Sequence, residues 1–153
     1  MIFTPAQIRL MVAHAEAAYP RECVGVLTGL WEKPEEIALN KLTNKLDELF
    51  KHDPARYRRD ARTGYFVDPK EVFDLVTRTQ KEGNKILAFY HSHPDNESYF
   101  SQEDLAAAVM WGEPVYPDAV YIVVSVFGGK AKEAKVFAWD GGGYAPAATL
   151  RIE

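Results

Sequence analysis

Ile86-Leu87-Ala88-Phe89-Tyr90-His91-Ser92-His93-Pro94 is an apolar run that leads directly into two histidines and a proline. The run predicts a buried β-strand, and the strand should end at Pro94 because proline has no backbone N–H for a sheet ladder. Alternate residues of a strand point to the same face, so His91 and His93 should project together while Ser92 points away. The sequence therefore brings two imidazoles together where a strand leaves its sheet.

The segment Ser101-Gln102-Glu103-Asp104 has the pattern of a capped helix start. A carboxylate in the first turn is favoured by the helix dipole, and Asp104 can face back toward the end of the strand. The full pattern, H-x-H-P-x6-S-x-x-D, supplies two imidazoles and one carboxylate. These are three protein ligands of a catalytic zinc site, whose fourth position holds an acidified water. We expect one Zn²⁺ bound by His91, His93 and Asp104.

A hydrolytic zinc site also needs a base that takes a proton from the water and passes it to a leaving amine. Glu22 is the candidate, because it opens an apolar strand from which a carboxylate can reach the water without binding the metal. The chain has many other glutamates, so spacing alone leaves this assignment open. Ser101 is expected to cap its helix and also to stabilise the oxyanion of a tetrahedral intermediate.

Capping signals and apolar periods predict the remaining elements. One helix should follow the Thr4 cap and end at Pro20, and a second should run from Asp68 to Gly83 with Val72, Phe73 and Val76 inward. The helix capped by Ser101 should stop near Gly112. The other expected strands are residues 23–30, 37–42, 119–127 and 134–139. Helices and strands interleave, which predicts an α/β fold: an α-β-α sandwich with a mixed sheet and about three helices.

Residues 44–63 differ from the rest, because they are highly charged and have no clear apolar period. We interpret them as a long, partly helical loop, which is either a functional lid or a mobile segment. Its arginines are either solvated or hold a partner's acidic surface or C-terminal tail. These arginines are Arg56, Arg58, Arg59 and Arg62.

The composition is that of one globular domain covering residues 1–153, with 47% hydrophobic and 26% charged residues. A net charge of -4 argues against a nucleic-acid partner. The sequence shows no signal-peptide pattern and no apolar run of membrane-spanning length, so we expect a cytoplasmic protein without a membrane partner. A single cysteine, Cys23, excludes a disulfide framework and fits a packing role.

Taken together, these motifs resemble the JAMM or MPN+ metalloprotease family, whose signature is an upstream glutamate, H-x-H-P, a short gap and S-x-x-D. The resemblance covers essentially the whole chain and is carried by residues 20–29, 90–94, 101–105 and 121–125. Two minor departures are Phe100, where the family often has proline, and the arrangement of Cys23-Val24. The resemblance implies an MPN fold, which is similar to that of cytidine deaminases.

The family resemblance also implies roles and a substrate. Zinc would be bound by His91, His93 and Asp104, Glu22 would be the general acid/base, and Ser101 would steady the oxyanion. Members of the family cleave peptide or isopeptide bonds after the C-terminal diglycine of ubiquitin-fold proteins, and which of the two bonds this chain cleaves is left open. A chain of this size is similar to bacterial and archaeal members associated with ubiquitin-like sulfur carriers. Such a carrier or its conjugate is the expected substrate, and whether the chain forms a homodimer is left open.

Three classes of function are compared at this point: a peptidase, a docking module and a different metal chemistry. The chain is either a peptidase or a docking module for a ubiquitin-like partner, in which zinc is structural or absent. Two histidines and a carboxylate also suit non-haem iron oxygenases, but that pattern places its second histidine far downstream. Zinc deaminases need P-C-x-x-C, which the sequence lacks.

Overall fold

The computed structural model describes residues 3–152, so residues 1, 2 and 153 of the expected domain lie outside its described part. Six strands form one sheet in the order β2-β1-β3-β6-β7-β8. They are β1 (Val24–Gly29), β2 (Ala38–Leu42), β3 (Lys85–Pro94), β6 (Val120–Phe127), β7 (Lys130–Trp139) and β8 (Tyr144–Leu150). A two-stranded hairpin pairs β4 (Val109–Met110) with β5 (Glu113–Pro114). The helices are α1 (Pro5–Ala18), α2 (Leu46–His52), α3 (Pro69–Lys81), α4 (Gln102–Ala108) and a short 3-10 turn, η1 (Pro34–Glu36).

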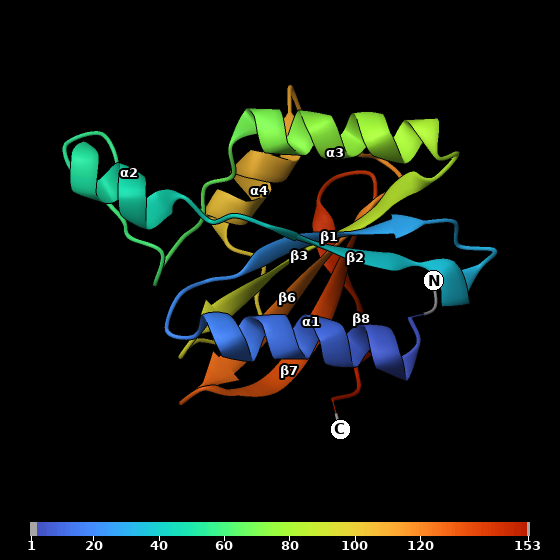
Figure 1. The fold of residues 1–153 in the computed structure, drawn as a ribbon, viewed down its shortest axis with the longest axis horizontal. Helices are drawn as coiled ribbons and strands as arrows, with labels where there is room; N and C mark the ends of the chain where they lie inside the picture. The colour runs from blue at the N-terminus through green and yellow to red at the C-terminus, as the bar shows by residue number, and fades with distance from the viewer. Residues whose placement is uncertain (1–2, 153) are drawn as a thin grey trace.

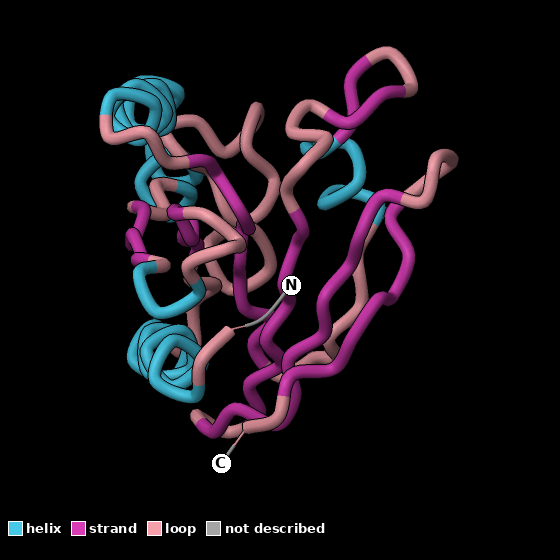
Figure 2. Tube along the Cα trace, turned by 90° about the vertical axis from the view of Figure 1, so that its right-hand side faces the viewer, coloured by secondary structure: helices cyan, strands magenta, loops and turns pink. Residues whose placement is uncertain are grey.

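The sheet is mixed and lies between helices. Within it, β3 and β6 run parallel, and the other neighbouring strands are antiparallel. Figures 1 and 2 show α1 and α3 on opposite faces of the sheet, with α4 on the same side as α3. The predicted α-β-α sandwich is confirmed, and α2 is the additional helix, which lies inside the segment expected to be a partly helical loop. None of the helices in residues 3–152 is both long and apolar enough to cross a membrane.

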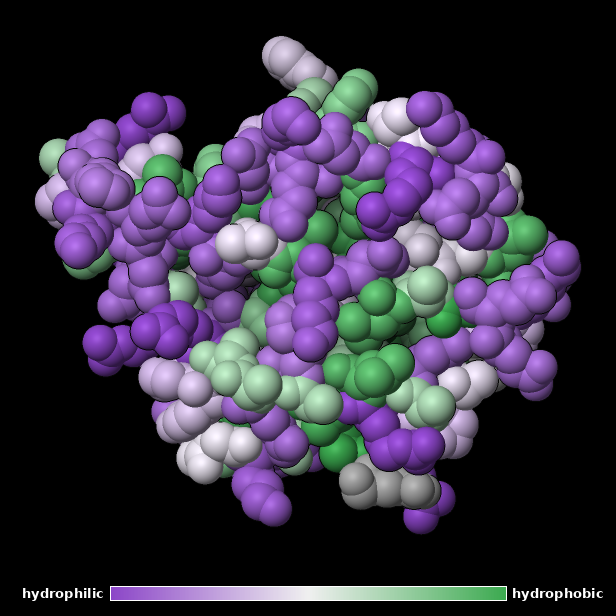
Figure 3. Space-filling model, in the orientation of Figure 1, coloured by the Kyte–Doolittle hydropathy of each residue, from purple (hydrophilic) through white to green (hydrophobic). Residues whose placement is uncertain are grey.

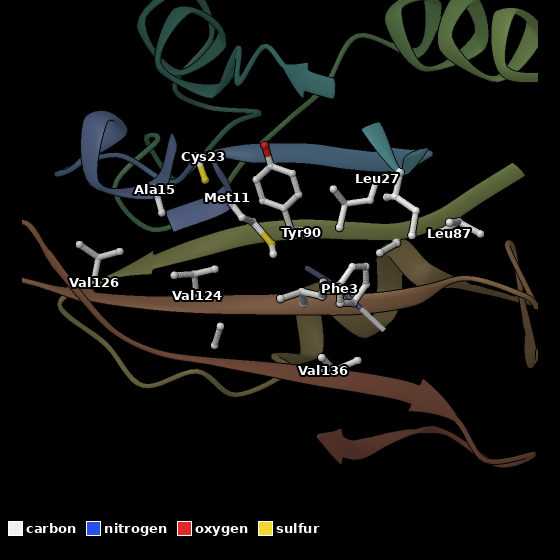
Figure 4. Packing of buried hydrophobic residues seen from close by; sticks show 14 residues of the cluster. Phe3, Met11, Ala15, Cys23, Leu27, Leu87, Tyr90, Val124, Val126 and Val136 are labelled. Carbon is white, nitrogen blue, oxygen red and sulfur yellow. The ribbon is translucent and has the colours of Figure 1, made fainter. Parts of the chain in front are cut away.

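The core on the α1 side is made by one set of alternate strand residues. Met11 and Ala15 of α1 are fully buried against Leu27, Tyr90 and Val124 of the sheet (Figure 4). Burying a side chain such as leucine or methionine contributes about 1.5–3 kcal/mol relative to leaving it in water. The helix begins with a capping box in which Thr4 Oγ1 accepts from the Gln7 N–H at 3.3 Å.

The other set of alternate residues faces α3 and α4. Val26 of β1 packs with Leu75 of α3, and Val123 of β6 packs with Ala108 of α4. Phe89 contributes to both of these clusters. Because strand side chains alternate, His91 and His93, two and four positions after Phe89, face this same side of the sheet. The two histidines of β3 therefore point toward α3 and α4.

One prediction about the inward face of α3 is wrong. Phe73 was expected inside but is 68% exposed, because Val72, Leu75 and Thr79 form the buried stripe of α3 and position 73 lies about 100° away from position 72. Trp111 is 94% exposed at the tip of the β4-β5 hairpin. That hairpin also ends α4 at Ala108, before the expected stop near Gly112.

Gly25 is required because Tyr90 fills the space where a side chain would be. The two residues are paired across β1 and β3, and a Cβ at position 25 would overlap the Tyr90 ring. We expect Gly25→Ala to lower the free energy of unfolding by about 3 kcal/mol, since overpacking displaces a buried ring. Gly143→Ala, where a Cβ meets nothing, should change it by less than about 0.5 kcal/mol. Urea unfolding measures both, and equal stability of the two variants would contradict this account.

Candidate active site

The two histidines lie at the end of β3, between β1 and β6. His91 is 1% exposed and His93 is 6% exposed. Ser92 points to the opposite face, where its Oγ accepts from the Cys23 backbone N–H at 2.8 Å. In return, the Ser92 backbone N–H donates to the Cys23 carbonyl at 3.2 Å. These bonds fix the end of β3 against the start of β1, and thereby fix the direction of both imidazoles.

Asp104 reaches the imidazoles from the first turn of α4. Its backbone N–H donates to Ser101 Oγ at 3.0 Å, and its Oδ2 accepts from the Ser101 backbone N–H at 2.9 Å. The same Oδ2 lies 3.2 Å from His91 Nε2 and 3.6 Å from His93 Nε2. The reciprocal cap therefore holds the carboxylate facing both histidines.

The three facing atoms have the spacing of ligands around one small cation. The two imidazole Nε2 atoms are 3.2 Å apart, and Asp104 Oδ2 is 3.2 and 3.6 Å from them. A tetrahedral zinc ion with bonds of about 2.0–2.1 Å keeps its ligands about 3.3 Å apart. Glu22 adds a second carboxylate, and its oxygen and one nitrogen of each histidine lie within 4.8 Å of one another. These residues form a group able to hold a metal ion.

His93 is oriented by the backbone beyond Pro94. Its Nδ1 lies 2.8 Å from the carbonyl oxygen of Glu97, which fits an Nδ1–H donor and leaves Nε2 as the ring atom that faces Asp104. The next residue, Ser98, is 1% exposed and donates from Oγ to Glu133 Oε2 at 2.6 Å. This buried bond anchors the turn that holds the Glu97 carbonyl in place.

Glu22 lies at the start of β1 under the segment that follows α2. It is 7% exposed, and its backbone N–H donates to the Ala61 carbonyl at 2.6 Å. Asn44 Nδ2 donates to the carbonyls of Glu22 at 2.9 Å and Gly64 at 3.1 Å. The segment therefore covers Glu22 and sets the position of its carboxylate beside the histidines.

Burial and neighbouring groups shift the pKa values of Glu22 and Asp104 in opposite directions. Burial raises the pKa of Glu22 to about 8, although the positive charge of His93 opposes the shift. Burial also disfavours the carboxylate of Asp104, but hydrogen bonds from both imidazoles outweigh it and hold its pKa well below the usual range. Burial lowers the pKa of His91, which favours the neutral imidazole that a metal requires. Asp104 is thus suited to hold a cation, and Glu22 to carry a proton.

An open cleft of about 760 Å³ leads to this group. Glu22, His93, Ser101 and Asp104 line the cleft, whereas His91 is fully buried behind it. The fold therefore brings together all five candidates from the sequence. Cys23 is buried and its pKa is raised to about 12, mainly by burial, which fits the expected packing role.

Two contributors to the site, Tyr65 and the Glu97 carbonyl, were not foreseen, whereas Arg59 was named among the arginines of residues 44–63. Tyr65 lies against His91, with ring centroids 5.1 Å apart, and burial raises the pKa of its hydroxyl. Arg59 crosses to α4, where its Nη2 donates to Glu103 at 2.7 Å. The Glu97 group is a backbone carbonyl, which every residue has, so the sequence gives no signal for its contact with His93. Arg59 had a signal in the charge of its segment, whereas Tyr65 follows Gly64 with no pattern around it.

Comparison with curated proteins finds relatives that are named as enzymes. The CysO-cysteine peptidase of Mycobacterium tuberculosis (strain H37Rv) is 31% identical over 119 residues, which are 77% of this chain and 68% of that protein. The desampylase of Haloferax volcanii is 27% identical over 106 residues, which are 69% of this chain and 63% of that protein. Both names agree with the hydrolase class expected from the sequence.

Solved structures and a family model extend the comparison to the whole fold. A protein from Desulfitobacterium hafniense has a TM-score of 0.62 at 23% identity and covers 95% of this chain and 88% of its own. A protein from Salinibacter ruber has a TM-score of 0.61 at 24% identity, with coverages of 100% and 92%. These two likenesses concern the fold. The family model matches residues 4–140, and on that match the chain belongs to the prokaryotic homologs of the JAB domain.

Proposed function

We propose that this protein is a zinc-dependent peptidase that hydrolyses the bond after the C-terminal diglycine of a ubiquitin-fold sulfur-carrier protein. The observation that supports the metal most strongly is the set of three atoms, two Nε2 and one Oδ2, at separations of 3.2–3.6 Å. In this proposal zinc is held by His91, His93 and Asp104. When bound, the ion supplies Lewis acidity, which polarises a carbonyl and acidifies a water.

Glu22 is proposed as the proton carrier of the reaction. Its carboxylate is buried beside the histidines, where it can take a proton from the attacking water and give it to the amine that leaves. A pKa raised to about 8 means that, without a metal ion, this carboxyl is mostly protonated at neutral pH. A divalent cation next to the carboxylate would lower that pKa and keep Glu22 ready to accept a proton.

Ser101 is proposed to stabilise negative charge on the substrate's carbonyl oxygen. Its Oγ uses an acceptor lone pair for the Asp104 backbone N–H, so its hydroxyl hydrogen is free to donate into the cleft. One side chain can therefore cap the helix and donate to a developing oxyanion.

Ser101→Ala should lower kcat about 100-fold, because it removes one oxyanion donor. It should also lower the free energy of unfolding by about 1 kcal/mol, because the cap is lost. The zinc content should stay the same. Ser101→Thr keeps both the hydroxyl and the cap and is the matched control. A Ser101→Ala enzyme with an unchanged kcat would show that the hydroxyl acts only in capping.

The substrate class is proposed from likeness and from the shape of the site. The resemblance to JAMM peptidases implies cleavage after a diglycine, and the Mycobacterium tuberculosis relative is named for CysO-cysteine. The cleft is open to solvent and is lined in part by residues 56–59 and 62–65, which suits an extended tail entering from a separate folded protein. We infer a ubiquitin-like carrier with one or more residues beyond its diglycine.

The test is cleavage of a purified ubiquitin-like carrier extended beyond Gly-Gly, followed by intact-mass spectrometry. We expect a product that ends at the second glycine, no product after chelation, and recovery of the product when zinc is returned. Binding of the carrier without cleavage under any metal condition would contradict the proposal. That result would favour the alternative function of a docking module for a ubiquitin-like partner.

A further inference from the structure

The rim of the cleft is strongly basic on one side. Residues 53–64 follow α2, and four arginines from this segment line the cleft: Arg56, Arg58, Arg59 and Arg62. In Figure 3 hydrophilic side chains gather over α2 and the segment after it. The acidic residues lining the same cleft are Glu22, Glu103 and Asp104. A basic rim above a metal-type site favours an anionic group on whatever enters.

Arg59 contacts α4, the helix that carries Asp104. Its Nη2 donates to Glu103 Oε1 at 2.7 Å, and its Nη1 donates to the Thr63 carbonyl at 3.3 Å. Glu103 is the neighbour of Asp104 in the first turn of α4. Arg59 therefore connects the segment after α2 to the helix turn that carries Asp104. Arg59 and Glu22, the proposed base, line the same cleft.

The contact between Arg59 and Glu103 is easily exchanged. The two side chains are 53% and 60% exposed, and a pair this exposed contributes no more than about 1 kcal/mol. A guanidinium has N–H donors in a planar fork that matches both oxygens of a carboxylate. A substrate carboxylate can therefore replace Glu103 as the partner of Arg59 with little loss of free energy.

The two bond types open to such an enzyme differ in where they carry a carboxylate. When the leaving group is a C-terminal amino acid, its free α-carboxylate is attached to the same carbon as the scissile nitrogen, about 3–4 Å away. When the leaving group is a lysine side chain, the whole side chain separates that nitrogen from the main chain. Glu22 must reach the scissile nitrogen to protonate it, so only the first substrate brings a carboxylate close to Arg59.

We infer that Arg59 binds the free α-carboxylate of a single amino acid behind the diglycine, so that the cleft selects a C-terminal peptide bond over a lysine isopeptide bond. This inference rests on the proposed function. In the reaction the bond between the glycine carbonyl carbon and the amine nitrogen breaks. The oxygen of water joins the new glycine carboxylate, and both of its protons end on the amine of the free amino acid.

The experiment compares three substrates built on one carrier tail. The first ends in Gly-Gly-Ala with a free carboxylate, the second is its C-terminal amide, and the third links the second glycine to a lysine Nζ. Zinc-loaded wild-type enzyme should cleave the acid with a kcat/KM about 30-fold above that of the amide, because one charge-assisted bidentate contact is lost. The lysine-linked tail should be cleaved no faster than the amide.

Variants assign this preference to one side chain. Arg59→Ala should lower kcat/KM about 30-fold on the acid and less than about 3-fold on the amide, so that the preference disappears. Arg59→Lys should restore part of it. Arg58→Ala removes the same charge from the same segment and should keep the preference. Equal cleavage of acid and amide by wild type, or equal losses on both in Arg59→Ala, would overturn the inference.

A binding measurement separates this inference from the proposed function. Calorimetry on Glu22→Gln protein should give a lower Kd for the acid than for the amide, and Arg59→Ala in that background should remove the difference. No cleavage of any tail by zinc-loaded wild type would contradict the proposed function. The ratio of the two Kd values would still test Arg59, and equal Kd values would reject its role.

Discussion

Glu22→Gln should lower kcat at least about 1,000-fold while the zinc content of the protein stays the same. Glutamine keeps the shape of the buried side chain but cannot take a proton from water or return one to the leaving amine. Glu22 is 7% exposed, so a base from the solvent does not easily take its place. Single-turnover cleavage of the extended carrier measures the rate, and plasma mass spectrometry measures the metal.

The control is Glu36→Gln, the same chemical change at an exposed side chain of η1. It should cleave at the wild-type rate. Normal turnover by Glu22→Gln would show that the proton passes through another group. Loss of zinc from Glu22→Gln would instead assign Glu22 to the metal, as a ligand beside His91 and His93.

Asp104→Ala should abolish stable zinc binding. Loss of an outer contact to a metal ligand costs about 10–100-fold in affinity, so loss of a direct carboxylate ligand should exceed about 100-fold. The change also leaves the buried imidazoles facing each other at 3.2 Å without their shared acceptor. Competition with a coloured chelator measures the affinity, and circular dichroism checks that the fold remains.

Glu103→Ala is the neighbouring control, because its side chain is 60% exposed and points to Arg59. That variant should bind zinc as tightly as wild type. If Asp104→Ala kept the wild-type affinity, the ligand set proposed from His91, His93 and Asp104 would be wrong.

The elements that surround the histidines could be predicted from short sequence patterns. The apolar run into His91, the proline that ends β3 and the serine that caps α4 each have one dominant local cause. Because strand side chains alternate, the shared direction of His91 and His93 also follows from the sequence alone. For these reasons the central part of the site could be predicted without a structure.

Other features depend on partners that are distant in the chain. The strand β8 was not expected, because Pro146 and short side chains give it a weak signal, and it exists by pairing with β7. Glu22 is buried because Ala61 and Asn44 arrive from another segment. The role of Arg59 in the cleft also depends on α4. Periodicity within one segment contains no information about contacts of this kind.

The most direct test of the central claim is a zinc titration into metal-free protein while cleavage of the extended carrier is followed. We predict no activity without metal, a linear rise in rate with added zinc, and a plateau at about one zinc per chain. Cleavage at the full rate by metal-free protein, or no cleavage at any zinc level, would contradict the account.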